Sequence, residues 1–153
     1  MRDFEKISFE QFKKDVSDNK DLYGKIILPK RETKGAAGYD FFAIEGFTLK
    51  PGESKKIPTG IKAFMDIDEV LFIAIRSSMG FYYNIRLCNQ IGIIDSDYYG
   101  NKDNEGHIWF KIKNEGEKDF VIRQGEAFGQ GIFLKYLITK SEKDEFIERT
   151  NLY

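Results

Sequence analysis

The chain has 153 residues, of which 41% are hydrophobic, and this is enough for one compact domain with a substantial core. Its 24 basic and 25 acidic residues nearly cancel, so the composition excludes a broadly basic nucleic-acid surface and a cationic membrane-binding patch. The sequence contains no apolar stretch of membrane-spanning length, and its single cysteine, Cys88, excludes an internal disulfide.

The N-terminus, MRDFEKISFEQF, is charged throughout and lacks the apolar segment of a secretory signal. Together with the lone cysteine, this favours a reducing compartment, and we expect a cytoplasmic protein. Cys88 is expected to be a small, buried hydrophobic residue, because no histidine lies near it in sequence to activate the thiol.

The first 24 residues (1–24) are expected to form a short helical extension. Ser8, followed by Gln11 three residues later, fits a helix-capping box, and phenylalanines recur on one helical face after it. The polar stretch SDNKD at 17–21 then ends the helix.

The following runs of apolar or alternating residues are expected to be strands of an all-β domain that covers residues 25–140. Turn-forming clusters rich in Gly, Asn, Asp and Ser separate these runs at spacings near ten residues, which is typical of a β-sandwich or a barrel. The runs comprise residues 25–28, 47–49, 70–75, 84–88, 92–96, 107–114, 120–122 and 130–138.

The run HIWFKIKN alternates strictly between apolar and polar residues. Ile108, Phe110 and Ile112 are expected to face one side of the sheet, and His107 and Trp109 the other. The only histidine of the chain is therefore expected on a polar face, as a structural residue, and the tryptophan in packing or in a subunit contact.

Two further segments have a distinctive composition. Residues 70–75 are apolar without alternation, so we expect both faces of this strand to be covered, one of them by another subunit. Residues 141–153 are highly charged, and they are expected to be an exposed tail or a short frayed helix.

Four short motifs combine residue types that suit a phosphorylated ligand. The first, AAGYD at 36–40, has small residues that allow close backbone approach, followed by Asp40 at the start of a Phe-rich strand. A carboxylate there either holds the water shell of Mg²⁺, an ion commonly shared with substrate phosphates, or is an ordinary turn residue.

The second motif, RSSMG at 76–80, directly follows an apolar strand and ends in a glycine turn. Arg76 offers a planar fork of donors that matches phosphate oxygens, and the hydroxyls of Ser77 and Ser78 donate to the same kind of anion. The alternative is a solvated loop with serine caps.

The third motif, GIIDSDYYGN at 92–101, ends an apolar strand with two carboxylates. Asp95 is expected on rigid backbone, where it would take a proton from water beside a metal-bound polyphosphate. Asp95 and Asp97 would repel each other on a straight strand, so a bend after Ser96 is expected to separate them. The alternative is a charged turn that protects a strand edge.

The fourth motif, GEAFGQ at 125–130, ends in Gln130. Its amide either lies over a ligand or belongs to an ordinary strand entry.

Taken together and in this order, the four motifs resemble those of the all-β dUTPase family, most closely the variants of Gram-positive bacteria and their phages. The resemblance covers residues 25–138. It implies a distorted jelly-roll subunit and a homotrimer with three active sites at subunit boundaries. It also implies hydrolysis of dUTP to dUMP and pyrophosphate with Mg²⁺.

The resemblance assigns the third motif to the nucleoside and the reacting phosphate. Asp95 matches the family's general base, which activates water for attack on the α-phosphorus. Tyr98 matches the tyrosine that packs under deoxyribose and excludes a 2′-hydroxyl. Asn89 and the backbone that includes Gly92 and Ile94 match a hairpin that pairs with the edge of uracil.

The other motifs match the phosphate and metal sites of the family. Arg76, Ser77 and Ser78 resemble residues that bind the phosphates from a neighbouring subunit. Gln130 matches a glutamine near the phosphate chain, and Asp40 matches an aspartate that binds the metal through water.

Two features depart from the family pattern. Ala127 stands where many members carry an arginine that contacts phosphate. The family's Gly-rich arm, with a Phe that closes over uracil, is not recognisable after Arg149, where the chain reads TNLY. Because closure excludes water and aligns the triphosphate, we expect nucleotide binding to be better preserved than turnover.

Two alternatives remain open. A catalytically weak dUTPase-like protein would keep the pocket and use its N-terminal helix or its tail to bind a protein partner, such as a repressor. The related dCTP deaminase branch shares the fold but needs a differently placed glutamate and additional basic residues. The stretch FYYNIRL after the second motif lacks those basic residues.

Overall fold

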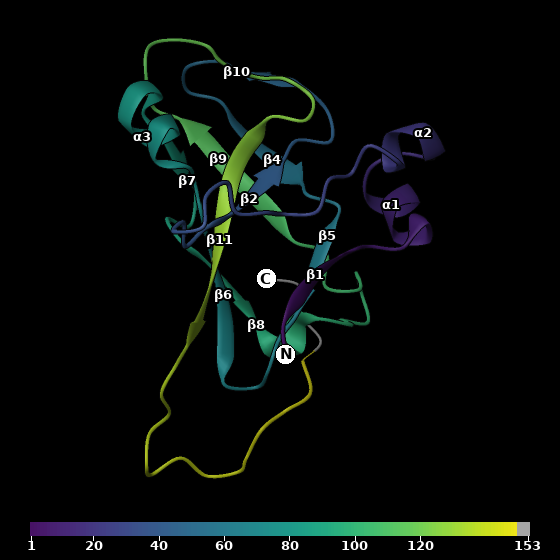
Figure 1. Ribbon diagram of the computed structural model, residues 1–153, viewed down its shortest axis with the longest axis vertical. Helices are drawn as coiled ribbons and strands as arrows, with labels where there is room; N and C mark the ends of the chain where they lie inside the picture. The colour runs from purple at the N-terminus through teal and green to yellow at the C-terminus, as the bar shows by residue number, and fades with distance from the viewer. Residues whose placement is uncertain (150–153) are drawn as a thin grey trace.

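The computed structural model describes residues 1–149 and consists mostly of short strands (Figure 1). The strands are β1 (Asp3–Lys6), β2 (Tyr39–Phe42), β3 (Phe47–Leu49), β4 (Ser54–Pro58), β5 (Ile61–Phe64), β6 (Glu69–Ala74), β7 (Ile85–Leu87), β8 (Gly92–Asp95), β9 (Trp109–Asn114), β10 (Phe120–Ile122) and β11 (Ala127–Lys135). The helical segments are α1 (Phe9–Asp15), α2 (Lys20–Tyr23), α3 (Ser77–Tyr83) and the 3-10 turn η1 (Ser96–Tyr98).

The strands pair in antiparallel fashion. One sheet has the order β2-β11-β6-β8, a second has the order β4-β9-β7, and β1 pairs with β5 and β3 with β10. Neighbours in each sheet are far apart in sequence, as in a jelly roll, so the all-β fold expected from the sequence is confirmed.

The two larger sheets pack against each other through aromatic side chains. Phe41 of β2 and Phe128 of β11 each contact Phe110 of β9, with ring centroids 5.2 Å apart in both pairs. Gly129 allows this approach, because a Cβ at its position would lie 2.5 Å from the Phe110 ring. The sheets therefore share one close-packed core.

The alternation expected for β9 holds for its apolar side. Ile108, Phe110 and Ile112 are fully buried in this core. The prediction that His107 lies on a polar face was wrong, because its side chain is 0% exposed. Helix α1 packs over that position and supplies Asp15 as a hydrogen-bonding partner.

Most expected strands are present, with ends shifted by up to three residues, but the strand at 25–28 is absent. Ile26 instead inserts over Gly60, where a Cβ would lie 2.7 Å from Ile26 Cδ1, while Ile27 and Leu28 are exposed. This segment is therefore a loop anchored by one side chain.

Three strands, β1, β4 and β5, were not predicted as strands, because their sequences are too charged or too short to give a clear apolar pattern. In β4, SKKIP, pairing with β9 determines the strand and buries Ile57. The glycine turn expected at 76–80 is also wrong, because helix α3 begins at Ser77 and continues through Gly80 to Tyr83.

The N-terminal helix begins where the capping box predicts, with the Ser8 hydroxyl accepting a hydrogen bond from the Gln11 N–H at 3.1 Å. The segment before it is a strand rather than more helix, because β1 pairs with β5. The N-terminal segment is thus joined to the main body by a backbone ladder.

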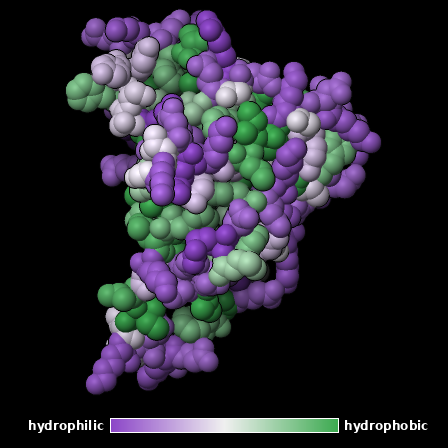
Figure 2. All heavy atoms as spheres, viewed as in Figure 1, coloured by the Kyte–Doolittle hydropathy of each residue, from purple (hydrophilic) through white to green (hydrophobic). Residues whose placement is uncertain are grey.

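The segment after β11 leaves the lower end of the sheet and loops back toward the N-terminus (Figure 1). Residues 141–148 are exposed and form no helix, as expected for a tail, and residues 150–153 lie outside the described part of the chain. Hydrophobic side chains gather near this lower end (Figure 2). The exposed side chains of Ile67, Ile138 and Ile147 line one cleft. No helix among residues 1–149 is long and apolar enough to cross a membrane.

Candidate active site

The register of the large sheet brings three of the four sequence motifs together. Gln130 on β11 lies opposite Asp40 on β2 and opposite Ala74 on β6. Directly paired residues of antiparallel strands point to the same face, so Asp40, Gln130 and the residue two beyond Ala74 share one side of the sheet. That residue is Arg76, whose Nε lies 3.5 Å from Asp40 Oδ1.

These side chains line one cleft of about 410 Å³, here called the Arg76 cleft. Its walls also include the hydroxyl-bearing residues Ser77 and Ser78 at the start of α3. The cleft is lined by Glu32, Thr33, Ala36, Ala37, Gly38, Asp40, Arg76, Ser77, Ser78, Gln130 and Ile132. The first, second and fourth motifs therefore form one polar surface, although they are far apart in sequence.

Gly38 of the first motif allows close approach of another side chain to the backbone. A Cβ on Gly38 would lie 2.1 Å from Gln130 Oε1, so the glutamine amide occupies the space that a side chain would fill. The same amide donates a hydrogen bond from Nε2 to the Ile75 carbonyl at 3.1 Å. Gly38 thus allows the Gln130 amide to lie against the backbone at the floor of the cleft.

The carboxylates of this cleft suit a loosely held divalent ion. Arg76 contacts Asp40 and also Glu32, with 3.7 Å between Nη2 and Oε2. No group of three His, Cys, Asp or Glu side chains within residues 1–149 forms a cage for a metal. One or two carboxylates beside a phosphate site fit Mg²⁺, which keeps several waters and shares the ligand's oxygens.

Basic residues that the sequence analysis did not single out lie next to this surface. Lys30 and Arg31 line an adjoining cleft of about 380 Å³ together with Asp40, Arg76 and Ala127. The backbone bridge between Lys30 and Asp40 holds this loop against β2. Positive charge is therefore present beside Ala127, although that position itself has none.

Asp95 lies at the end of β8, where it pairs with Val70 of β6. Its side chain is about half exposed, and its Oδ2 lies 2.5 Å from Arg149 Nη2. The same guanidinium contacts Asp97, with 2.6 Å between Nε and Oδ1, and the hydrogen bond to Asp97 is the main reason why the pKa of Arg149 is raised. The turn η1 provides the expected bend, and Arg149 offsets the repulsion between the two carboxylates.

Asp95 and Arg76 lie near opposite ends of β6. Asp95 pairs with Val70 near the start of β6, and Arg76 lies six residues beyond Val70. At about 3.3 Å per residue, their backbones are roughly 20 Å apart. Asp95 lines a separate cleft of about 860 Å³ with Ser96, Arg149 and other residues, so one chain does not bring the acidic residue to the Arg76 cleft.

The other residues of the third motif are largely structural within one chain. Ile94 is buried, and Gly92 is required by packing, because a Cβ there would lie 2.3 Å from Ile73 Cγ1. The expected hairpin is not a paired one, since β7 belongs to the sheet of β9 and β8 to the sheet of β6. Asn89 lies in the turn between these strands, where Gln90 has a positive φ of 64°.

A third cleft, of about 610 Å³, contains Asn89 and is here called the Asn89 cleft. Its lining also includes Asp15 of α1, Asn104 and Trp109. Tyr98 is buried behind this region, and its hydroxyl both accepts a hydrogen bond from Asn104 Nδ2 and donates one to the His107 carbonyl, each at 2.7 Å. Gly92, Ile94 and Tyr98 line none of these three clefts, and the other candidate residues divide among them within the single chain.

Comparison with known proteins supports the resemblance. The sequence profile of the dUTPase family matches residues 24–153. A deoxyuridine 5′-triphosphate nucleotidohydrolase of Lactococcus lactis is 44% identical over 126 residues, which are 82% of this chain and 84% of that protein. The dUTPase of Streptococcus mutans superposes with a TM-score of 0.73 at 38% identity, covering 91% of this chain and 99% of that one.

A more distant structural neighbour shares the fold. A mutant dUTPase from phage phi11 of Staphylococcus aureus superposes with a TM-score of 0.69 at 17% identity, covering 97% of this chain and 99% of that one. That protein coordinates a structural Mg(II) ion.

Proposed function

Because the chain belongs to the dUTPase family, we propose that it hydrolyses dUTP to dUMP and pyrophosphate, with Asp95 as the general base and Mg²⁺ as the cofactor. The observation that carries the proposal is the convergence of Asp40, Arg76 and Gln130 in one cleft through the register of three neighbouring strands. Phosphoryl transfer depends mainly on positioning and charge neutralisation, and the arginine, hydroxyl and amide groups of this cleft are suited to both.

In this mechanism, the carboxylate of Asp95 takes a proton from water as the water oxygen attacks the α-phosphorus, and pyrophosphate leaves. Arg76 and the hydroxyls of Ser77 and Ser78 bind the phosphate chain, and Gln130 orients it from the cleft floor. Asp40 would hold the ion through water, and bound Mg²⁺ would neutralise phosphate charge.

Lys30 and Arg31 are the proposed replacement for the phosphate contact that Ala127 does not make. Both line the cleft that contains Ala127, and neither has an ion pair with a carboxylate among the described contacts. Arg31 Nη1 donates hydrogen bonds only to carbonyls, those of Lys34 and Ala36, so its charge remains available to an anion.

The separation of Asp95 from Arg76 supports a homotrimer in which each site combines groups from different chains. A triphosphate is too short to span about 20 Å of strand, so one chain cannot apply both groups to it. The outer face of the sheet also exposes apolar side chains, including the paired Phe72 and Ile93, as expected for a surface covered by another subunit. We place the enzyme in the cytoplasm, without nucleic-acid or membrane partners.

The contact between Arg149 and Asp95 favours the regulatory alternative as the second candidate. An arginine on the proposed base would have to leave before Asp95 could accept a proton from water. A protein held in this arrangement would bind nucleotide with weak turnover and would signal to a protein partner.

Pyrophosphate release from dUTP, dCTP, dTTP and UTP tests the proposal. We expect dUTP to be the preferred substrate, and Asp95→Asn to reduce turnover by about 10²–10⁴-fold while retaining affinity for a non-hydrolysable dUTP analogue. Asp97→Asn is the matched control, because it removes a neighbouring carboxylate that also contacts Arg149, and its turnover should stay within about threefold of the parent. Equal losses in the two variants would exclude Asp95 as the base, and tight analogue binding without turnover in the parent would favour the regulatory alternative.

A further inference from the structure

The N-terminal segment, residues 1–23, lies outside the part of the chain that matches the dUTPase profile. It is nevertheless an integral part of the fold. Strand β1 pairs with β5 along its whole length, and Phe4, Ile7 and Phe12 are buried in the common core. Because this segment is held by strand pairing and core packing, it can fix the positions of the residues that it contacts.

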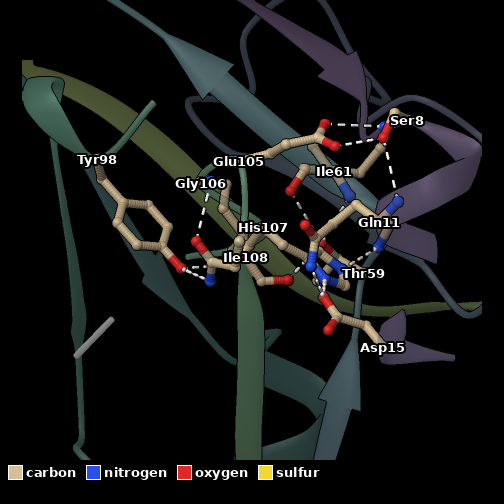
Figure 3. Close-up of polar contacts among 12 residues, drawn as sticks. Ser8, Gln11, Asp15, Thr59, Ile61, Tyr98, Glu105, Gly106, His107 and Ile108 are labelled. Carbon is tan, nitrogen blue, oxygen red and sulfur yellow. Dashed lines mark hydrogen bonds and ion pairs between the residues drawn. The ribbon is translucent and has the colours of Figure 1, made fainter. Parts of the chain in front are cut away.

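The polar contacts of Ser8 and Asp15 in this segment reach the loop that follows the third motif (Figure 3). The Ser8 backbone N–H donates to Glu105 Oε1 at 2.9 Å, and the Ser8 hydroxyl donates to the other oxygen of the same carboxylate. Lys62 of β5 also donates to Glu105. These partners of Glu105 lie at the N-cap of α1 and on β5, so the loop is fixed at Glu105.

A second attachment is made through His107, which is fully buried. Its Nε2 accepts a hydrogen bond from the Gly60 N–H at 2.9 Å, so the ring proton resides on Nδ1 and is donated to Asp15 Oδ2 at 2.6 Å. Gln11 donates to the same oxygen at 3.0 Å. One carboxylate of α1 therefore fixes both the orientation and the tautomer of the imidazole.

The residue held in this way is also the partner of Tyr98. The Tyr98 hydroxyl donates to the His107 carbonyl, and Asn104 from the same loop donates to the Tyr98 hydroxyl (Figure 3). Two links thus connect Asp15 to the tyrosine ring, first the Asp15–His107 hydrogen bond and then the His107–Tyr98 hydrogen bond. Asp15 also lines the Asn89 cleft, next to Asn104.

We propose that Asp15 and His107 are positioning residues that hold the ring of Tyr98 in place and thereby set the preference for deoxyribose over ribose. This inference rests on the proposed function and on the role that the family resemblance implies for Tyr98, which is exclusion of the 2′-hydroxyl. Steric exclusion of the 2′-oxygen requires the Tyr98 ring to stay close to the sugar. If the contact at His107 is lost, the loop can shift and the ring can move away from the sugar. In this proposal the N-terminal segment acts on sugar preference through Tyr98.

The test measures kcat and KM of the full chain for dUTP and UTP. Asp15→Ala should lower the ratio of kcat/KM for dUTP over UTP by roughly tenfold or more, mainly because UTP gains. Asp15→Asn keeps an acceptor for the imidazole proton and should restore the ratio to within about threefold of the parent. Glu10→Ala is the control on the same helix, since Glu10 is exposed and its ion pair within residues 1–149 is with Lys13 on the same helix.

Tyr98→Phe gives a second measurement, which does not depend on whether the Asp15 variant folds. It keeps the ring and removes only the hydroxyl that bonds to the His107 carbonyl, so it should lower the same ratio. In a double variant with Asp15→Ala the two losses should not add, because both act on one ring.

Different outcomes separate this inference from the proposed function. The inference would be overturned if Asp15→Ala and Tyr98→Phe both left the ratio of kcat/KM for dUTP over UTP unchanged and lowered only the melting temperature. The hydrogen bonds from Asp15 to Tyr98 through His107 would then contribute to stability alone. Absence of dUTP hydrolysis in the unmodified chain would instead overturn the proposed function.

Discussion

Gly38 shows how one missing side chain shapes the candidate site. Its position is filled by the Gln130 amide, whose Oε1 lies where a Cβ would come within 2.1 Å. The obstructing atom is the far end of a flexible side chain, so the fold can absorb an added methyl group if the glutamine swings away. Such a substitution is therefore expected to affect catalytic activity more than the free energy of unfolding.

Gly38→Ala is therefore expected to lower dUTP hydrolysis about as much as Gln130→Ala does, with a loss of unfolding free energy within about 1 kcal/mol. Gly35→Ala is the matched control, because nothing lies within 4 Å of a Cβ built there. Steady-state kinetics and thermal unfolding of the three variants provide the measurements. A Gly38 variant as active as the Gly35 variant would show that the position of the Gln130 amide does not matter.

At the scale of elements, helix α1 is attached to the main body through the buried imidazole of His107, which is neutral. Burial lowers the pKa of His107, and the hydrogen bond and charge of Asp15, with the charge of Glu105, only partly oppose this. The geometry agrees, because protonation of Nε2 would remove the acceptor used by Gly60. The Glu105 contact behaves differently, since burial would raise the pKa of this carboxyl but the hydrogen bonds from Ser8 and Lys62 outweigh it and lower the pKa.

This arrangement predicts that acid weakens the attachment of α1. Because the pKa of His107 is lower in the folded state, the unfolded chain binds more protons between the two pKa values. The contribution of this group to the free energy of unfolding is therefore fully present above about pH 6.5 and falls as the pH drops below it. The loss levels off below the folded-state pKa and amounts to about 1.4 kcal/mol for each unit of lowering.

Chemical denaturation between pH 7.5 and about 5 would measure this effect. His107→Gln keeps an acceptor for the Gly60 N–H but does not titrate, so its unfolding free energy should depend less on pH over this window. Parallel curves for the variant and the parent would mean that other groups cause the acid sensitivity.

At the scale of the whole molecule, the sheet separates the proposed base from the proposed phosphate arginine. Asp95 and Arg76 lie near opposite ends of β6, in different clefts. Under the proposed mechanism a single subunit would lack one of the two groups, and activity would depend on assembly.

Mixing two inactive variants tests this arrangement. Arg76→Ala and Asp95→Asn should each lose most dUTP hydrolysis as homogeneous proteins. When they are unfolded together and refolded as an equal mixture, about a quarter of the sites should combine an intact Asp95 with an intact Arg76, and activity should return to that fraction. A mixture without recovered activity would place both groups in one chain's site and contradict the shared arrangement.

Local patterns in the sequence were sufficient for the fold class, whereas the candidate site residues were identified only by the family resemblance of the four motifs together. Alternation in β9 identified the buried face with Ile108 and Phe110, and the Ser8 cap located the start of α1, since both depend only on neighbours along the chain. Strands without an apolar pattern, such as β4, were missed, because their partners and not their own residues determine them.

The order and spacing of the four motifs by themselves determined which family the chain resembles and which residues are the candidates. Only the tertiary structure decided that Asp40, Arg76 and Gln130 lie together, and that Asp95 lies opposite the start of β6, far from Arg76. The tertiary structure also decided that His107 is buried and bonded to Asp15. It also revealed Arg149 beside Asp95. The physical reason is that strand register and the packing of α1 depend on contacts between segments that are distant in sequence. A local sequence pattern contains no information about which distant segments pair.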